Sequence, residues 1–360
     1  MRIFLVINRN FYLFIAALKK LNLRKLIGRN FMFKNSLKRF ALGALFAGLL
    51  SSTFAYAETD GKKVALIVGP SQDAFIGTWV KTFIENASAK GIEVESFSSP
   101  FDPALQTRQI DDAVAQKFDA ILVQPISQNA ILPVLFRAKE SSIPVITIMV
   151  KLDEKAKDLY VSYVGEDAYT LGSLAGEAMV NALKNAGKET ARIAAITGSL
   201  SEGIAPVRMA GFKDTIAKLA PGVEIVAVED VKWNPVAGEQ VAGQLLVRFS
   251  SDGGLDGIYG MNDRLANSVI QAATTIGVST GTGKDDLIVI GGNCQGPGMR
   301  NMQTNAMAAT VEMLPAVSAK VAVGVLDKLF SDQAVEKTYF ETHTIITSAN
   351  LASHIEACSY

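Results

Sequence analysis

From residue 63 onwards, short apolar runs alternate with segments in which apolar residues recur at helical spacing. Strands that are apolar on both faces and are separated by helices are typical of parallel sheets covered on both sides. The alternation starts afresh after Asp167 with a long helical segment at 169–186. Two series of similar size predict an α/β protein with two doubly wound parallel-sheet lobes. The predicted strands are 64–68, 92–97, 119–125, 143–150 and 161–165 in the first series, and 192–197, 223–229, 257–261 and 287–291 in the second.

The segments after residue 306 are too short for a third domain. They comprise a β-rich run at 307–311, a helical pattern at 315–330 and a β-rich tail at 339–347. Because such pieces cannot bury a core of their own, they must pack on the two lobes. We therefore expect the two lobes to exchange chain segments.

The basic residues are concentrated in one part of the chain. Residues 1–57 carry ten Lys or Arg and no acid, whereas the chain from Glu58 onwards holds 25 basic and 35 acidic residues. An acidic body is a poor binder of nucleic acid, so we expect no nucleic-acid partner.

The basic N-terminal segment contains the pattern of a secretory signal peptide. A cationic segment begins at Met32, an apolar run spans 40–50, and Ala55-Tyr-Ala57 precedes Glu58. This order predicts a signal peptide cleaved after Ala57 and a periplasmic protein, and the alternative is an uncleaved membrane anchor. Translation is predicted to start at Met32, which makes residues 1–31 a start-site artefact.

The cysteine content bears on redox and metal chemistry. Cys294 and Cys358 are the two cysteines. An oxidising compartment permits one disulfide, but nothing in the spacing demands it. We expect a free buried pair, with the disulfide as the alternative. Two thiols without further ligands make no zinc site, so neither a metal nor a cofactor is expected.

No catalytic constellation stands out. The two histidines, His343 and His354, both lie in the tail and leave little for a Ser-His or Cys-His dyad. Gly281-Thr-Gly-Lys284 lacks the spacing of a phosphate loop and the Ser or Thr that should follow the lysine. We predict a binding protein and not an enzyme. A glycosidase pair of carboxylates stays an alternative, because such a pair is defined by the distance between two carboxylates in space, which the sequence does not give.

The segment 256–267 reads as a strand, a polar corner and a helix. We expect Asp263 to cap the helix, which leaves the Asn262 amide free to point outward at the carboxyl end of the strand. Open α/β sheets bind ligands at those strand ends. The alternative is that the Asn-Asp pair is only a turn and a cap.

A series of motifs follows in order along residues 62–350. They are the strand and loop 64–76, Ile143-Pro-Val-Ile-Thr147, Val164-Gly-Glu-Asp167 with Gly172 and Gly176, Arg208-Met-Ala-Gly-Phe212, Gly260-Met-Asn-Asp263 and Val289-Ile-Gly-Gly-Asn293. Their order and spacing resemble the type I periplasmic sugar-binding proteins of the ribose-binding kind. The resemblance implies the periplasmic binding protein type I fold and a monomer that presents one small ligand to the inner-membrane permease of an ABC importer.

The resemblance also implies lobes and a hinge. The N-terminal lobe would comprise 58–166 and 314–342, and the C-terminal lobe 167–313 and 343–360. The three hinge crossings would fall near Asp167, Met313 and Thr342.

Ligand-facing positions implied by the resemblance are Asp73, Phe75, Ile76, Met149, Val150, Pro206, Trp233, Asn262, Asn293 and Met313. A sugar has an apolar ring face and a polar edge. Trp233 and Phe75 can supply flat faces, while Asp73, Asn262 and Asn293 can supply side chains that fork onto hydroxyls. The alternative for Trp233 is a core anchor.

This chain departs from the family at Met149, Val150, Pro206 and Met313, where polar residues are common. A buried hydroxyl without a partner costs on the order of 1–3 kcal/mol, so an ordinary pentopyranose should bind poorly. We expect a less hydroxylated or differently shaped ligand, such as a deoxy sugar, a polyol or another small polar molecule with an apolar flank. The alternatives are a ligand-sensing component of a signalling or chemotaxis receptor and, less favoured, a secreted hydrolase.

Four further side chains lie near the predicted crossings or in the predicted sheets. We expect Glu166 and Glu312 to form surface ion pairs, and the alternative is that they contact the ligand. Tyr163 and Tyr259 are expected in the β-sheet cores, and the alternative is that they reach the cleft.

Overall fold

The computed structural model describes residues 59–201, 203–358 and 360. The predictions of a signal peptide, its cleavage after Ala57 and a start at Met32 lie outside these residues. None of the helices in the described ranges combines the length and the apolar character needed to cross a membrane.

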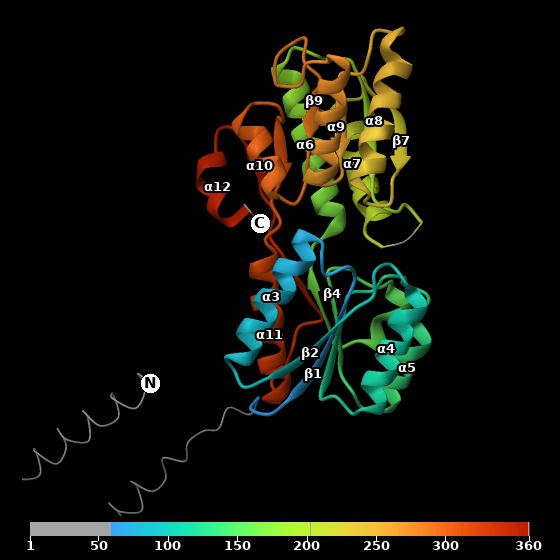
Figure 1. Ribbon diagram of the computed structural model, residues 1–360, viewed down its shortest axis with the longest axis vertical. Helices are drawn as coiled ribbons and strands as arrows, with labels where there is room; N and C mark the ends of the chain where they lie inside the picture. The colour runs from blue at the N-terminus through green and yellow to red at the C-terminus, as the bar shows by residue number, and fades with distance from the viewer. Residues whose placement is uncertain (1–58, 202, 359) are drawn as a thin grey trace, which may run out of the picture. The chain divides into compact units, whose positions relative to one another are not determined.

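The first sheet has six strands, all parallel, and helices on both faces (Figure 1). Alternate residues of its strand β1 enter different cores: Val64 and Leu66 face one side, Ala65 and Ile67 the other. Its strands, in spatial order, are β11 (Thr338–Phe340), β5 (Ser162–Gly165), β4 (Val145–Ile148), β3 (Ala120–Val123), β1 (Lys63–Val68) and β2 (Glu93–Ser98). Its helices are α3 (Ala74–Ser88) and α11 (Pro315–Phe330), which pack together, and α4 (Pro103–Ala115) and α5 (Leu132–Glu140); the 3-10 turn η2 (Glu154–Leu159) lies beside α5.

The second sheet also has six strands, and its edge strand β12 runs antiparallel to β10. Its spatial order is β12 (Ile345–Thr347), β10 (Ala309–Val311), β9 (Ile288–Ile290), β8 (Gly257–Gly260), β6 (Ala191–Thr197) and β7 (Val223–Asp230). Its helices are α6 (Ala168–Asn185) against α7 (Ala205–Leu219), α8 (Pro235–Ser250) against α9 (Asp263–Ile276), and α10 (Gly296–Gln303) with α12 (Leu351–Cys358). Two parallel-sheet α/β lobes confirm the predicted fold class.

The chain passes between the two sheets at three places. It leaves the first sheet after β5, returns to it after β10 through α11, and leaves it again between β11 and β12. Asp167 lies in the first link, where its carboxylate caps α6 by accepting from Thr170 N at 3.1 Å. Met313 lies in the second link and Thr342 in the third.

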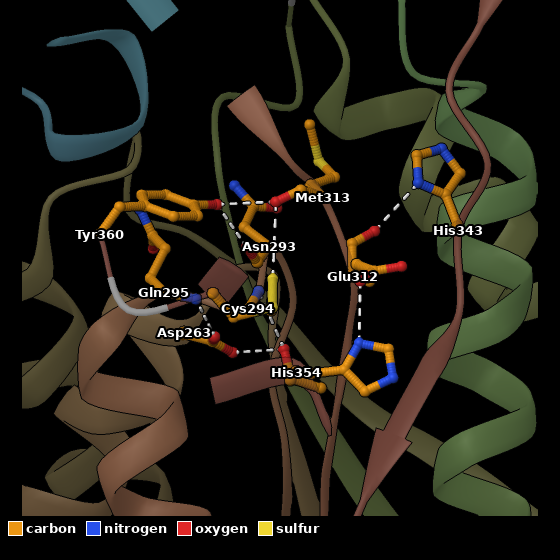
Figure 2. Close-up of a disulfide and its surroundings, with 11 residues drawn as sticks. Asp263, Asn293, Cys294, Gln295, Glu312, Met313, His343, His354 and Tyr360 are labelled. Carbon is orange, nitrogen blue, oxygen red and sulfur yellow. Dashed lines mark hydrogen bonds and ion pairs between the residues drawn. A yellow bond between two sulfur atoms is a disulfide. The ribbon is translucent and has the colours of Figure 1, made fainter. Parts of the chain in front are cut away.

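The expectation of two free cysteines is wrong. Cys294, which follows β9, and Cys358, at the end of α12, form a disulfide with their Cα atoms 5.1 Å apart (Figure 2). The two residues are 64 positions apart in the sequence, and the packing of α12 against α10 and β12 brings them together. That packing is a tertiary contact, which the spacing of the cysteines could not reveal.

Candidate ligand site

The predicted ligand positions lie near the carboxyl ends of strands in both sheets. Asp73, Phe75 and Ile76 follow β1, Met149 and Val150 follow β4, and Trp233, Asn262, Asn293 and Met313 follow β7, β8, β9 and β10. Pro206 lies in the first turn of α7, after β6, and is half-buried. Parallel sheets gather ligand-binding loops at these ends. The structure therefore places the predicted positions in the regions where α/β proteins bind ligands.

On the first lobe, the Asp73 carboxylate is already engaged by protein. One oxygen caps α3 by accepting from Phe75 N at 2.9 Å and from Ile76 N at 3.3 Å. The other oxygen forms an ion pair with Arg264, which belongs to α9 of the second lobe. Phe75 and Ile76 are buried behind this cap. Asp73 thus holds the loop and contacts the opposite lobe, so little of its hydrogen-bonding capacity remains for a ligand.

Several predicted positions have an unusual backbone. Met149, Trp233 and Asn293 have φ values of 61°, 64° and 80°. Left-handed backbone is uncommon for residues other than glycine and costs most for bulky ones, and such residues cluster at ligand sites. Three of the predicted positions therefore adopt a backbone conformation that is uncommon for residues other than glycine.

The prediction that Asp263 caps α9 is wrong, because Asn262 makes the cap. Asn262 is the N-cap of α9, because its Oδ1 accepts from Leu265 N at 2.9 Å. Asp263 points inward instead and is fully buried, with its carboxylate accepting from Thr310 Oγ1 at 2.7 Å and from Gln295 N at 2.6 Å (Figure 2). Gly298 makes room for it, since a Cβ there would lie 2.3 Å from Asp263 Cγ.

Two consequences follow from these positions. Burial raises the pKa of Asp263 to about 7, although its hydrogen bonds oppose the rise. Capping uses the oxygen of the Asn262 amide, and no hydrogen bond within the described residues uses its Nδ2. Asn262 therefore keeps two N–H donors available at the strand end.

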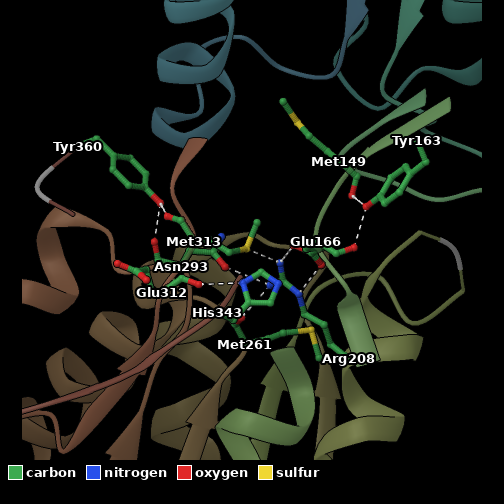
Figure 3. Close-up of polar contacts among 10 residues, drawn as sticks. All are labelled: Met149, Tyr163, Glu166, Arg208, Met261, Asn293, Glu312, Met313, His343 and Tyr360. Carbon is green, nitrogen blue, oxygen red and sulfur yellow. Dashed lines mark hydrogen bonds and ion pairs between the residues drawn. The ribbon is translucent and has the colours of Figure 1, made fainter. Parts of the chain in front are cut away.

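A buried ion pair at the centre of the site was missed. Arg208 and Glu166 are 1% and 2% exposed, and the guanidinium binds both oxygens of the carboxylate, with Nε 2.9 Å from Oε1 (Figure 3). The expectation that Glu166 forms a surface ion pair is wrong. Burial by itself lowers the pKa of Arg208, but the Glu166 carboxylate more than compensates and raises it.

Arg208 also organises three of its neighbours. Its Nη1 donates to Met261 O and to Asn293 Oδ1, each at 3.2 Å, and its Nη2 lies 3.2 Å from Met313 Sδ. Arg208 reaches this position because α6 and α7 pack closely: a Cβ at Gly172 would lie 1.9 Å from Arg208 O. The arginine stood in a sequence motif, but its burial is a tertiary property.

Trp233 packs over the same arginine. The guanidinium carbon of Arg208 lies 5.7 Å from the centre of the indole ring, in cation–π geometry. A Cβ at Gly198 would lie 1.8 Å from the ring, so a glycine is required beneath it. Trp233 is half-buried. The ring is thus positioned by protein contacts and retains exposed surface.

Tyr360 is a further residue that the sequence reasoning missed. Its hydroxyl donates toward the carbonyl oxygens of Asn293 and Met313, the latter at 3.0 Å (Figures 2 and 3). Its ring meets that of Phe75 edge to face at 6.1 Å between centroids. Three predicted ligand positions therefore contact this one tyrosine. No motif marked it, since it lies beyond the β-rich tail.

The remaining predictions concern side chains around the site. Tyr163 and Tyr259 are buried in the sheets, as predicted. Glu312 is not a surface residue: its side chain is 13% exposed and lies 2.9 Å from His354 Nδ1. Cys358 lies close to that pair, but its sulfur is bonded to Cys294 and offers no thiolate to a metal. Two surface hollows, one between α8 and α9 and one beside η2, contain none of the predicted positions.

The fold and this arrangement define a two-lobed binding protein. Residues 64–334 match the family described as periplasmic binding protein domain, and the chain belongs to that family. The chain is 26% identical to a putative rhizopine-binding protein of Rhizobium meliloti, over 88% of this chain and 98% of that protein. It is 24% identical to the ribose import binding protein of Escherichia coli (strain K12), over 81% and 92% of the two chains.

Solved structures show the same fold. A galactofuranose binding protein superposes with a TM-score of 0.76 at 22% identity, covering 82% of this chain and 98% of that one. A Caulobacter myo-inositol binding protein gives 0.73 at 20% identity, covering 81% and 95%. The predicted resemblance to type I periplasmic sugar-binding proteins is confirmed, and the homologues are solute-binding proteins of ABC transporters rather than enzymes.

Proposed function

We propose that the protein captures one small carbohydrate-like solute, a sugar, deoxy sugar or polyol, between its lobes and delivers it to an ABC permease in the inner membrane. The observation that carries this proposal is the buried Arg208, which contacts Trp233, Asn293 and the carbonyl oxygen of Met261, the residue before Asn262, at the strand ends of the second sheet. Export through a signal peptide cleaved after Ala57, residence in the periplasm and a monomeric state are parts of the same proposal.

The hydrogen-bonding groups left at the site favour a ligand that presents few hydroxyl protons to the protein. Asn262 and Asn293 each use Oδ1 within the protein, and no hydrogen bond in the described ranges occupies either Nδ2. The carboxylates of Asp73 and Glu166 are paired with arginines. Donors therefore outnumber free acceptors, and each hydroxyl proton without an acceptor costs on the order of 1–3 kcal/mol.

Apolar side chains complete the site on the first lobe. Phe75, Ile76, Met149 and Val150 are each at most 7% exposed and offer no hydrogen-bonding side chain. The cargo then has oxygen acceptors along one edge and an apolar flank on the other. A deoxy sugar or a cyclic polyol with one face of C–H groups fits this description.

Capture of the solute requires the two lobes to close over it. We propose that residues 58–166 with 314–342 rotate against 167–313 with 343–360 about the links at Asp167, Met313 and Thr342. A ligand that contacts both lobes favours the closed form, since it binds that form better. The permease would recognise the closed form.

A thermal-shift screen tests the proposal. The purified protein is scanned with D-ribose, 2-deoxy-D-ribose, D-allose, myo-inositol and glycerol, and hits are measured by calorimetry. A solute that binds only the folded state raises the melting temperature. We expect hits that are lost in Trp233→Ala and Asn262→Ala but kept in Val247→Ala, which alters an exposed side chain on α8. Micromolar or tighter binding of D-ribose contradicts a cargo that presents few hydroxyl protons to the protein.

A further inference from the structure

Tyr360 lies where the two halves of the candidate site meet. Its ring touches Phe75, which begins α3 in the first lobe, while its hydroxyl faces the carbonyls of Asn293 and Met313 in the second. Phe75, Asn293 and Met313 were each expected to face the ligand. A side chain in contact with all three belongs to the boundary of the same site.

Three attachments hold Tyr360 in this place. Cys358, two residues before it, is bonded to Cys294, which is the residue after Asn293 (Figure 2). The main-chain oxygen of Tyr360 accepts from Gly296 N at 3.2 Å. The hydroxyl supplies the third attachment at Asn293 and Met313. The disulfide thus links the segment that carries Tyr360 to the loop that carries Asn293.

The direction of the hydroxyl decides what Tyr360 can offer to a ligand. Its proton is committed to main-chain carbonyls, so the part of the side chain left to meet a ligand is the ring. Aromatic rings pack well against the C–H face of a sugar or polyol and leave its hydroxyls to other groups. Together with Phe75, the ring enlarges the apolar flank of the site.

We propose that Tyr360, held by the Cys294–Cys358 disulfide, is a specificity-determining residue of the ligand site and selects solutes that present an apolar face. This inference rests on the proposed function and adds to it the residue that shapes the flank. It also assigns a role to the disulfide, which keeps the aromatic ring beside Asn293.

Calorimetry with D-ribose, 2-deoxy-D-ribose, D-allose, myo-inositol and glycerol tests the inference on the wild type, Tyr360→Ala, Tyr360→Phe and Cys358→Ser. Tyr339→Ala is the matched control, because that half-buried tyrosine lies on the edge strand β11 and bonds to Glu336 N. We expect Tyr360→Ala to weaken the tightest-bound solute at least tenfold or to change the order of preference. Tyr360→Phe keeps the ring and should lose less, Cys358→Ser should fall between them, and Tyr339→Ala should change nothing.

The outcomes separate this inference from the proposed function. If the wild type binds a solute and Tyr360→Ala keeps every affinity within twofold, the role of Tyr360 is overturned while the proposed function stands. Binding by Tyr360→Ala of a solute that the wild type rejects supports the inference, because the ring then excludes that solute. If neither protein binds any of the five solutes, both the proposed cargo class and the selection by Tyr360 are overturned. Circular dichroism of each variant reports whether it is folded.

Discussion

The two halves of the candidate site are built in opposite ways. In the first lobe, Phe75, Ile76, Met149 and Val150 are apolar side chains presented by a helix start and a left-handed turn. In the other half, Arg208 of the second lobe forms a buried charged pair with Glu166, which follows β5 at the end of the first lobe, and the same arginine donates to Asn293. The apolar half is stabilised by packing, whereas the polar half is stable only when each polar group has a hydrogen-bond or ion-pair partner. A single substitution should therefore reduce stability or affinity far more in the polar half than in the apolar half.

Breaking the buried ion pair should have the largest effect. Arg208→Met leaves the Glu166 carboxylate buried without its partner, which typically costs about 3–5 kcal/mol of stability. Urea denaturation measures the loss. The double variant Arg208→Met with Glu166→Gln should recover part of it, since no unpaired charge remains.

A matched surface pair serves as the control for this prediction. Arg137 and Asp111 make a similar two-point contact, but their side chains are 47% and 41% exposed. Arg137→Met should cost at most about 1 kcal/mol. Equal losses in Arg208→Met and Arg137→Met would show that burial does not distinguish the two pairs.

The buried Asp263 should make stability depend on pH. Its pKa is about 7 in the folded protein against 3.8 for an unperturbed side chain, so the folded state binds the proton more tightly. The contribution of this bound proton to the free energy of unfolding is complete below pH 3.8 and is lost as the pH rises through about 7. Between pH 5 and pH 8 the wild type should lose about 2–3 kcal/mol relative to Asp263→Asn.

Denaturation of both proteins at pH 5 and pH 8 measures this difference. Asp119→Asn is the control, because hydrogen bonds and nearby lysines lower the pKa of Asp119 despite partial burial, so that it titrates below this window. A constant difference between the wild type and Asp263→Asn at the two pH values would contradict the raised pKa.

Substitutions at Asn262 should separate capping from ligand binding. Asn262→Asp keeps an oxygen that can cap α9 but removes the Nδ2 donors, whereas Asn262→Ala removes both. Both variants should bind the best solute of the screen about 10-fold to 100-fold more weakly. Only Asn262→Ala should also lose about 1 kcal/mol of stability. Unchanged affinity in both variants would remove Asn262 from the site and leave it a cap.

The smallest effect is expected in the apolar half. Val150→Thr keeps the shape of the side chain and adds one hydroxyl to the flank. It should raise the affinity for D-ribose relative to 2-deoxy-D-ribose by about threefold to fivefold, as one modest hydrogen bond allows. Calorimetry with both sugars measures the ratio. A ratio that moves toward 2-deoxy-D-ribose would contradict an apolar flank at Val150.

The sequence by itself determined the alternation of strands and helices, and with it the two-lobed fold. Apolar periodicity is a local property, so strands such as β1 and β8 could be placed within a few residues. It also predicted that the candidate ligand loops lie near strand ends, because parallel sheets bring their carboxyl ends to one edge.

The tertiary structure alone decided which side chains in those loops are free. Asn262 and Asp263 are adjacent, and either residue type can cap a helix. Because Gly298 has no side chain, the Asp263 carboxylate fits in the interior, and Asn262 caps α9. The Arg208–Glu166 pair and the Cys294–Cys358 disulfide join residues 42 and 64 positions apart. Such pairings depend on helix packing and on chain segments that return to a lobe, and no local pattern encodes the distance between them.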